Sequence, residues 1–406
     1  MRRDAWVAIC LLGAGWVLIL QVMPWSDERI NDLGVYRVYA DQMLAGNLPY
    51  RDFFIEYPPL SAPLLWLAGL PGTDYDVYRV SFAVLTFVLG VGVVLLCGEL
   101  AGQTGGARRR ALYAAALMPV VGGAMLRTHF DLAPIAITLG ALWLLCVERP
   151  RSGLALLGVG TLVKGFPLVA VPVALAWLVG RGLRRDAWQG AAACGAVVVA
   201  VSGVAFALSP DGALDAVDYH LGRPLQIESA PAVAALGLDR LGIGDSDVRS
   251  SHGSEGVHHP AAGALEIFFT LALLAAIAAL AFAAARDGST RTLVLASLTA
   301  VAAFAVLGKV LSPQFMTWVI PLGALAFAWR LHALATALVM ALVLTLVEFP
   351  AHYFDYVHGD RAVMLLVAAR DAVLLACLAL AFVALHRCRE EQLLDRRRAA
   401  VAAGVD

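Results

Sequence analysis

Residues 77–100 read VYRVSFAVLTFVLGVGVVLLCGEL, a run whose charged side chains, Arg79 and Glu99, lie near its two ends. An α-helix rises 1.5 Å per residue, so roughly 20 apolar residues cross the ~30 Å hydrocarbon core of a bilayer. This run is therefore long enough to span a membrane. The glycines within GVGVV permit close contact with neighbouring helices.

Similar runs recur along the whole chain of 406 residues, which is 60% hydrophobic and only 15% charged, with a mean hydropathy of +0.77. In soluble domains about a quarter of all residues are charged. The lower charged fraction of this chain indicates an all-α polytopic membrane protein. We expect about twelve transmembrane helices. They cover 5–23, 77–100, 111–126, 131–147, 153–164, 166–180, 187–208, 263–285, 292–308, 315–329, 333–348 and 363–386.

Basic residues predict how these spans are oriented. Arginines such as those at 108–110 and 181–185 lie in alternate connections, which the positive-inside rule assigns to the cytoplasm together with both termini. The connections 24–76 and 209–262 then face the extracytoplasmic side. We expect residues 1–386 to form one membrane domain and residues 387–406 a charged cytoplasmic tail. The Arg-, Ala- and Val-rich composition favours a bacterial plasma membrane.

Cationic side chains gather at the predicted outer ends of the spans. Lys164 in GTLVKGFP, Lys309 in VLGKVLSPQF and Arg127 in MLRTHFDLAP lie at this level, and His220 and Arg223 open the connection 209–262. A ring of cations at one interface is suited to a lipid-linked phosphate. The alternative is that Lys and Arg side chains only extend from helix ends to water.

The first external connection contains a second set of polar groups. Residues 33–46, LGVYRVYADQMLAG, have the spacing of an amphipathic helix, with Arg37 and Asp41 as an i,i+4 pair. Asp32 precedes this helix by one residue. It is either an N-cap, accepting free backbone N–H groups, or a general base at the lipid–water boundary.

Further polar residues leave alternatives open. Asp131 is an auxiliary acid or a cap of the span 131–147, paired with Arg127. Arg370 and Asp371 lie inside the last apolar run, where charges mark function or a later helix start. The Ser-, Gly- and His-rich stretch 245–260 predicts a mobile loop.

Several of these motifs together resemble one known family. An early Asp in the first external connection, a YPP turn at 57–59, VKGFPL, YHLGRPLQIES and GKVLSPQFMTW are similar to glycosyltransferase family 87. That family belongs to the C-type superfamily of polyprenyl-phosphate-sugar-dependent transferases and includes mannosyltransferases. The resemblance covers about residues 30–330.

The resemblance implies roles for particular residues. Asp32 occupies the place of the superfamily's catalytic carboxylate in the first external loop. Lys309, Ser312 and Gln314 match the motif near the lipid-donor site, and His220, Arg223 and Glu228 match the element opening the large loop. Many members have an adjacent acidic pair where this chain has Asn31–Asp32, which argues against a divalent metal. No other cofactor is implied.

The chemistry of such a transfer fits the residues found. A base takes the proton of the acceptor hydroxyl, and cations stabilise the departing phosphate. We therefore expect Asp32 and Asp131 as catalytic residues and Lys309, Arg223, Lys164, Arg127, His220 and Gln314 as phosphate ligands. The expected partners are a polyprenyl-phosphate sugar, with mannose implied by the resemblance, a glycolipid or glycan acceptor and membrane lipids, but no nucleic acid. Direct displacement would invert the anomeric centre.

Two other classes compete with a transferase. A transporter or flippase of lipid-linked sugars usually holds its polar groups near the bilayer midplane, on broken helices of two related halves. Here the charges collect at one face instead. A non-catalytic partner in envelope assembly would not need an external carboxylate beside cations.

Overall fold

The structure, a computed structural model, describes residues 2–402, with side chains described to Cys388; residues 403–406 of the expected tail lie outside this range. It is mostly helical, as predicted. The α-helices are α1 (Arg2–Gln21), α2 (Leu33–Leu44), α3 (Ala62–Gly69), α4 (Tyr75–Gln103), α5 (Arg108–Ala116), α6 (Met118–Gly122), α7 (Met125–Thr128), α8 (Leu132–Cys146), α9 (Pro150–Val163), α10 (Ala170–Gly180), α11 (Arg184–Leu208), α12 (Pro210–Leu221), α13 (Ala230–Arg240), α14 (Ala262–Asp287), α15 (Thr290–Leu307), α16 (Ile320–Ala328), α17 (His332–Glu348), α18 (Tyr353–Val357) and α19 (Arg361–Ala402). Short 3-10 helices, η1 (Pro59–Ser61), η2 (Phe166–Val169) and η3 (Pro313–Val319), precede α3, α10 and α16.

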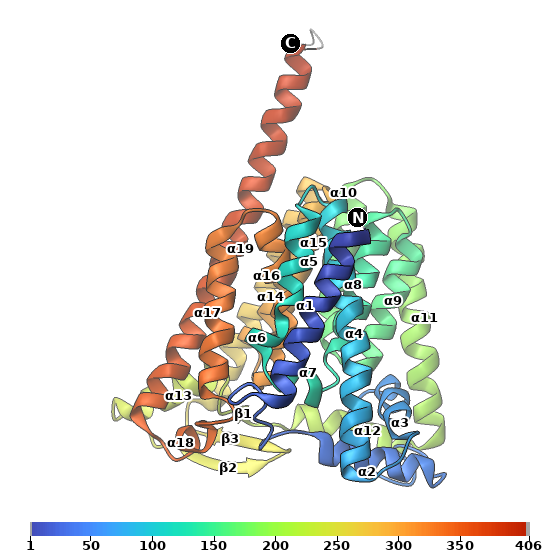
Figure 1. The fold of residues 1–406 in the computed structure, drawn as a ribbon. Helices are drawn as coiled ribbons and strands as arrows, with labels where there is room; N and C mark the ends of the chain where they lie inside the picture. The colour runs from blue at the N-terminus through green and yellow to red at the C-terminus, as the bar shows by residue number, and fades with distance from the viewer. Residues whose placement is uncertain (1, 403–406) are drawn as a thin grey trace.

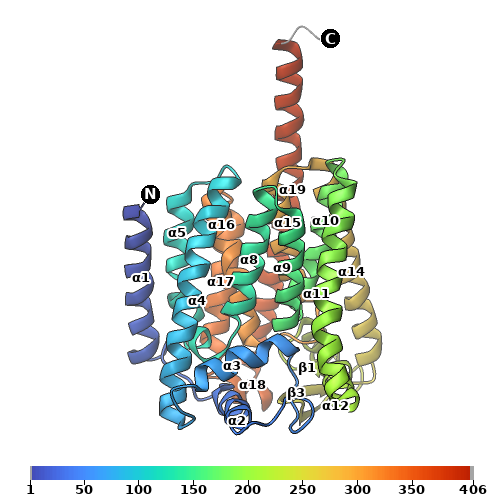
Figure 2. The same ribbon diagram turned by 90° about the vertical axis from the view of Figure 1, so that its right-hand side faces the viewer.

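Among the described residues, six helices are long and apolar enough to cross a membrane. They are α1, α4, α11, α14, α15 and the part of α19 up to Cys388. Shorter apolar helices, including α8, α10 and α17, lie beside them in the bundle (Figures 1 and 2). The expected number of twelve spans remains a prediction.

The expected span 111–126 differs most from the structure. It is divided into α5, α6 and α7 because two residues interrupt a continuous helix. Pro119 has no N–H to donate within a helix, and Gly123 adopts a φ of 55° at the end of α6. The resulting turns bring α7 and Arg127 to the end of the bundle at which α2 lies.

The polar connections gather at one end of the bundle. Figure 1 shows the N-terminus and the C-terminal half of α19 at one end, with α2, α12 and the strands at the other. The connections 24–76 and 209–262 therefore share one face, as the sequence predicts. Assignment of that face to the extracytoplasmic side remains a prediction.

Residues 245–260, expected as a mobile loop, instead form a hairpin. Strands β2 (Asp247–Ser251) and β3 (Ser254–His258) pair antiparallel, with His252 and Gly253 at positive φ in the turn. Strand β1 (Leu225–Gln226) pairs with the other edge of β3, giving the order β1-β3-β2. The hairpin thus fixes residues 225–226 at the end of the bundle.

Helix α15 lies at the centre of the bundle. Its side chains from Thr292 to Leu307 are buried, apart from the half-buried Phe304. Residues of α4, α8, α10, α14, α16 and α19 surround it. In contrast, α11 and α14 expose large apolar side chains over most of their length, including Phe206 and Phe268. An apolar exterior around an equally apolar core is what a bilayer requires.

Close packing of α10 against α14 gives a test of the fold. A Cβ at Gly180 would lie 1.9 Å from the carbonyl oxygen of Ala285, whereas a Cβ at Gly195 in α11 would meet nothing within 4 Å. We expect Gly180→Ala to destabilise the protein by about 1–3 kcal/mol, because backbone must move. Gly195→Ala should be neutral or stabilise by up to ~1 kcal/mol. Thermal unfolding in detergent measures both, and equal melting temperatures would contradict this packing.

Candidate functional site

Asp32 lies at the start of α2 with its carboxylate free of helix capping. Asp32 holds the N-cap position, but Asn31 makes the side-chain bond: its Oδ1 accepts the N–H of Leu33 at 2.9 Å and its Nδ2 donates to the Glu28 carbonyl at 2.5 Å. The Asp32 side chain makes no capping bond. The N-cap interpretation of its carboxylate is therefore wrong, although its backbone oxygen accepts the first helical bond from Tyr36.

The Asp32 carboxylate faces two other polar side chains. Its Oδ2 accepts a hydrogen bond from the Tyr36 hydroxyl at 3.1 Å and lies 3.5 Å from His129 Nε2. About a third of the side chain, 36%, is exposed. Burial, and then the charge of Asp32, raise the pKa of the nearby Tyr57 phenol, so this hydroxyl stays protonated. Asp32 thus has other polar side chains, Tyr36 and His129, beside it when it accepts a proton.

The expected Arg37–Asp41 pair does not form. Arg37 donates to the carbonyl of Thr73 at 3.1 Å, and Asp41 accepts from the Thr73 hydroxyl at 2.7 Å. Both contacts attach α2 to the turn before α4. This part of α2 is structural.

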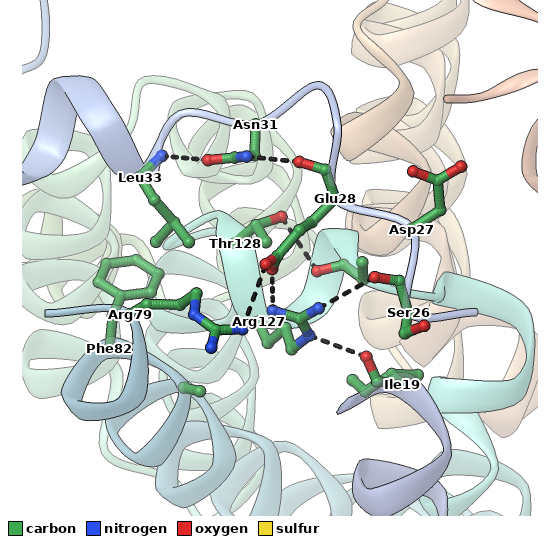
Figure 3. Close-up of polar contacts among 12 residues, drawn as sticks. Ile19, Ser26, Asp27, Glu28, Asn31, Leu33, Arg79, Phe82, Arg127 and Thr128 are labelled. Carbon is green, nitrogen blue, oxygen red and sulfur yellow. Dashed lines mark hydrogen bonds and ion pairs between the residues drawn. The ribbon is translucent and has the colours of Figure 1, made fainter. Parts of the chain in front are cut away.

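Arg127 is buried among acceptors rather than open to a ligand. Its Nε donates to the Ile19 carbonyl at 2.8 Å, one Nη to the Ser26 carbonyl at 3.2 Å and the other to Glu28 (Figure 3). Glu28 also pairs with Arg79 of α4 at 3.2 Å. A phosphate could bind Arg127 only by displacing these acceptors.

Asp131 pairs with Lys164 and not, as expected, with Arg127. Lys164 Nζ lies 2.7 Å from Asp131 Oδ1, which also accepts the indole N–H of Trp318 at 2.5 Å. The side chain of Asp131 caps nothing, so the capping interpretation is wrong too. Its buried Oδ2 has no partner in the described part of the chain.

Aromatic rings surround the ammonium of Lys164, an arrangement that was not predicted from the sequence. The ammonium lies 4.9 Å from the ring centre of Phe130 and 5.5 Å from that of Phe315. Trp318 stacks on Phe315 with ring centres 3.9 Å apart. Faces of aromatic rings stabilise a cation that has lost its water. The sequence feature that could have predicted these rings is the spacing of Phe315 and Trp318, which lie three residues apart on η3.

His220 and Arg223 belong to the connection 209–262, and Lys309 follows α15. His220 Nε2–H donates to the Glu56 carbonyl at 2.8 Å, and Arg223 donates to the Ser254 hydroxyl at 2.9 Å. Lys309 donates to the carbonyl of Leu221 at 2.8 Å, at the end of α12, and pairs with Glu266 at 3.0 Å. The His220–Glu56 bond joins the connections 24–76 and 209–262, and the bond from Lys309 ties the segment after α15 to the end of α12.

Arg223 and Lys164 both lie close enough to His220 for their charges to affect its pKa. Its imidazole keeps an edge in solvent, yet partial burial lowers its pKa, and the positive charges of Arg223 and Lys164 lower it further. The hydrogen bond to Glu56 opposes these effects. At neutral pH His220 is therefore a neutral hydrogen-bond donor.

Of the predicted phosphate ligands, Lys164 and Arg223 lie near enough to His220 to affect its pKa, and Lys309 bonds the carbonyl of Leu221, the residue after His220. Gln314 lies on η3 near Trp318, and its buried Oε1 has no partner among the described residues. Arg127 does not belong to this group, because its guanidinium pairs with Glu28. No three His, Cys, Asp or Glu side chains in residues 2–388 are grouped as ligands of a metal ion.

Comparison with known proteins gives a structural likeness but no sequence match. No family model matches the chain, and no curated protein matches it. A crystal structure of the Archaeoglobus fulgidus oligosaccharyltransferase, tethered to an acceptor peptide containing the NVT sequon, matches with a TM-score of 0.44 and 14% identity. The match covers 95% of this chain but 55% of that one. At this level of similarity the likeness supports no conclusion about activity, and the resemblance to family 87 remains a prediction.

The buried ion pair of the site can be tested by removing one partner. Lys164→Met should destabilise the protein by about 3–5 kcal/mol, because Asp131 would be left buried without its cation. Adding Asp131→Leu should restore most of that loss. Thermal unfolding in detergent measures both variants. A double variant no more stable than Lys164→Met would contradict a direct pair.

The depressed pKa of His220 predicts a dependence of stability on pH. Below its usual pKa of about 6.5, the unfolded chain binds a proton that folded His220 does not, so stability falls as the pH drops through that range. His220→Gln keeps a donor for Glu56 but does not titrate. Between pH 7.5 and 5.0 the melting temperature of the wild type should fall further than that of this variant, by on the order of one degree. Equal losses would contradict it.

Proposed function

We propose that this protein is an integral-membrane glycosyltransferase that moves a sugar, mannose by family resemblance, from a polyprenyl-phosphate donor to a glycolipid or glycan acceptor on the extracytoplasmic face. The observation that carries the proposal is the Asp32 carboxylate. Asn31 makes the capping bond in its place, and α2, which Asp32 precedes, lies at the same end of the bundle as α12, which carries His220 (Figure 1).

Asp32 is the proposed general base. It accepts the proton of the acceptor hydroxyl while that oxygen attacks the anomeric carbon and the bond from this carbon to the phosphate oxygen breaks. The phosphate monoester leaves with both electrons of that bond. One carboxylate on the attacking side favours inversion of the anomeric centre.

Cations stabilise the charge on the leaving phosphate. Lys164, Arg223 and Lys309 supply positive charge, and His220 supplies a neutral donor. The buried, unpaired atom of Gln314 is its Oε1, which only accepts hydrogen bonds and so does not support phosphate binding. We leave Arg127 out of this set, because its guanidinium is occupied by Ile19, Ser26 and Glu28.

Asp131 takes a different part from the one expected. Its bond to Lys164 makes it a partner that holds the ammonium in place. The same oxygen accepts from Trp318, and the other oxygen is buried. We therefore assign acid–base chemistry to Asp32 alone.

Asp32→Asn tests the proposal, with Asp41→Asn as a matched control on the same helix. Loss of a general base should reduce sugar transfer about 10²–10⁴-fold, whereas Asp41, which bonds Thr73, should matter little. Membranes with equal amounts of each protein are assayed with polyprenyl-phosphate mannose and lipid extracts as acceptors.

The outcomes separate the candidate functions. Equal transfer by wild type and Asp32→Asn would remove Asp32 from the chemistry and leave Asp131 to be tested. No transfer by the wild type, together with movement of the lipid-linked sugar across vesicles, would favour the flippase.

A further inference from the structure

A buried cluster of charges lies away from the proposed reaction, around Arg370 of α19. Its guanidinium is 1% exposed and pairs with Asp371 at 2.9 Å. Glu228 lies 3.6 Å and Glu348 3.9 Å from the other Nη, and neither is exposed by more than 1%. Burying such groups costs several kcal/mol per ion unless their geometry compensates for it. We therefore expect the cluster to have a structural or functional role.

The cluster holds the backbone that follows Arg223. Arg370 donates to the carbonyl of Glu228 at 2.5 Å, and the Glu228 carboxylate accepts from the Gln226 side chain at 2.8 Å. Tyr356 of α18 donates to the carbonyl of Ile227 at 2.8 Å. Residues 226–228 are therefore fixed to α18 and α19 by side chains, besides their pairing with β3.

Gln226 in turn holds the segment that carries Lys309. Its N–H donates to the Lys309 carbonyl at 2.9 Å, and its side-chain oxygen accepts the N–H of Leu311 at 3.2 Å. This segment lies between the end of α15 and η3 and has no regular structure. One buried glutamine thus holds the backbone at the Lys309 carbonyl and at the Leu311 N–H, on either side of Val310.

We propose that Arg370 is a positioning residue for phosphate binding: through Glu228 and Gln226 it fixes the backbone of residues 309–311 and so holds the Lys309 ammonium at the site. Arg370 itself touches no substrate. The proposal rests on the proposed function for the meaning of the phosphate, but the linkage from Arg370 to Lys309 can be measured without any substrate.

The two lysines of the chain, Lys164 and Lys309, provide that measurement. Reaction of each with an amine reagent is followed by peptide mass spectrometry on the purified protein, with Lys164 as the internal reference. Arg370→Met and, in case that variant does not fold, Gln226→Met are compared with Arg240→Met. Arg240 also attaches an external helix, α13, to the α18–α19 connection through Gly359, but without contact to residues 225–229 or 309–311.

We expect modification of Lys309 to quicken on the order of tenfold in Arg370→Met and Gln226→Met, because each loses hydrogen bonds that hold the segment. Lys164 should react as in the wild type, and Arg240→Met should change neither lysine. Unchanged reactivity of Lys309 in both variants would overturn the proposal. So would an equal rise for both lysines, since that indicates general loosening.

The same variants are then assayed for transfer. The kcat/KM for the polyprenyl-phosphate sugar should fall about tenfold, because the Lys309 ammonium both binds the donor phosphate and stabilises the charge that develops as it leaves. Combining Gln226→Met with Lys309→Met should be no worse than Lys309→Met alone, because both act through one ammonium. A double variant that loses as much transfer as the two single variants combined would overturn the proposal. A wild type without transfer would overturn the proposed function, while the lysine reactivities would still decide the linkage.

Discussion

The end of the bundle that carries the site depends on one buried guanidinium. Arg127 has no water to bond, so its nitrogens must find acceptors in the protein, and they take the Ile19 and Ser26 carbonyls and Glu28. These contacts attach the end of α1 and the following residues to α7. Since Glu28 also accepts from the Asn31 side chain, the same attachment sets where Asp32 enters α2.

Much of the fold follows from hydropathy, and the exceptions have physical causes. The expected spans 187–208 and 263–285 lie within α11 and α14, because long apolar runs leave a backbone in lipid no other way to satisfy its hydrogen bonds. The span 111–126 was expected as one helix, but Pro119 and Gly123 divide it. The hairpin over 247–258 could not be predicted, since its strands are short and lack alternation of apolar and polar residues.

The level of the site was predictable, but its pairings were not. Local spacing favoured Asp131 as the partner of Arg127, whereas the fold supplies Glu28, which is 99 residues away in the chain. Asn31 and Asp32 are equally good caps by residue type, and only the geometry shows which one acts. The role of Asp32 as a base and of the cations as phosphate ligands rests on chemistry and family resemblance.

Helix α15 has a consequence for biosynthesis. Its buried faces contact α4, α8, α10 and α14, which precede it along the chain, but also η3, α16 and α19, which follow it. While the ribosome is still making those later segments, one side of α15 has no protein partner and only lipid can cover it. The bundle therefore cannot close around its own centre until α19 has been made and inserted. Lys309, which directly follows α15, acquires its neighbours at 226–228 in their final place only at that last step.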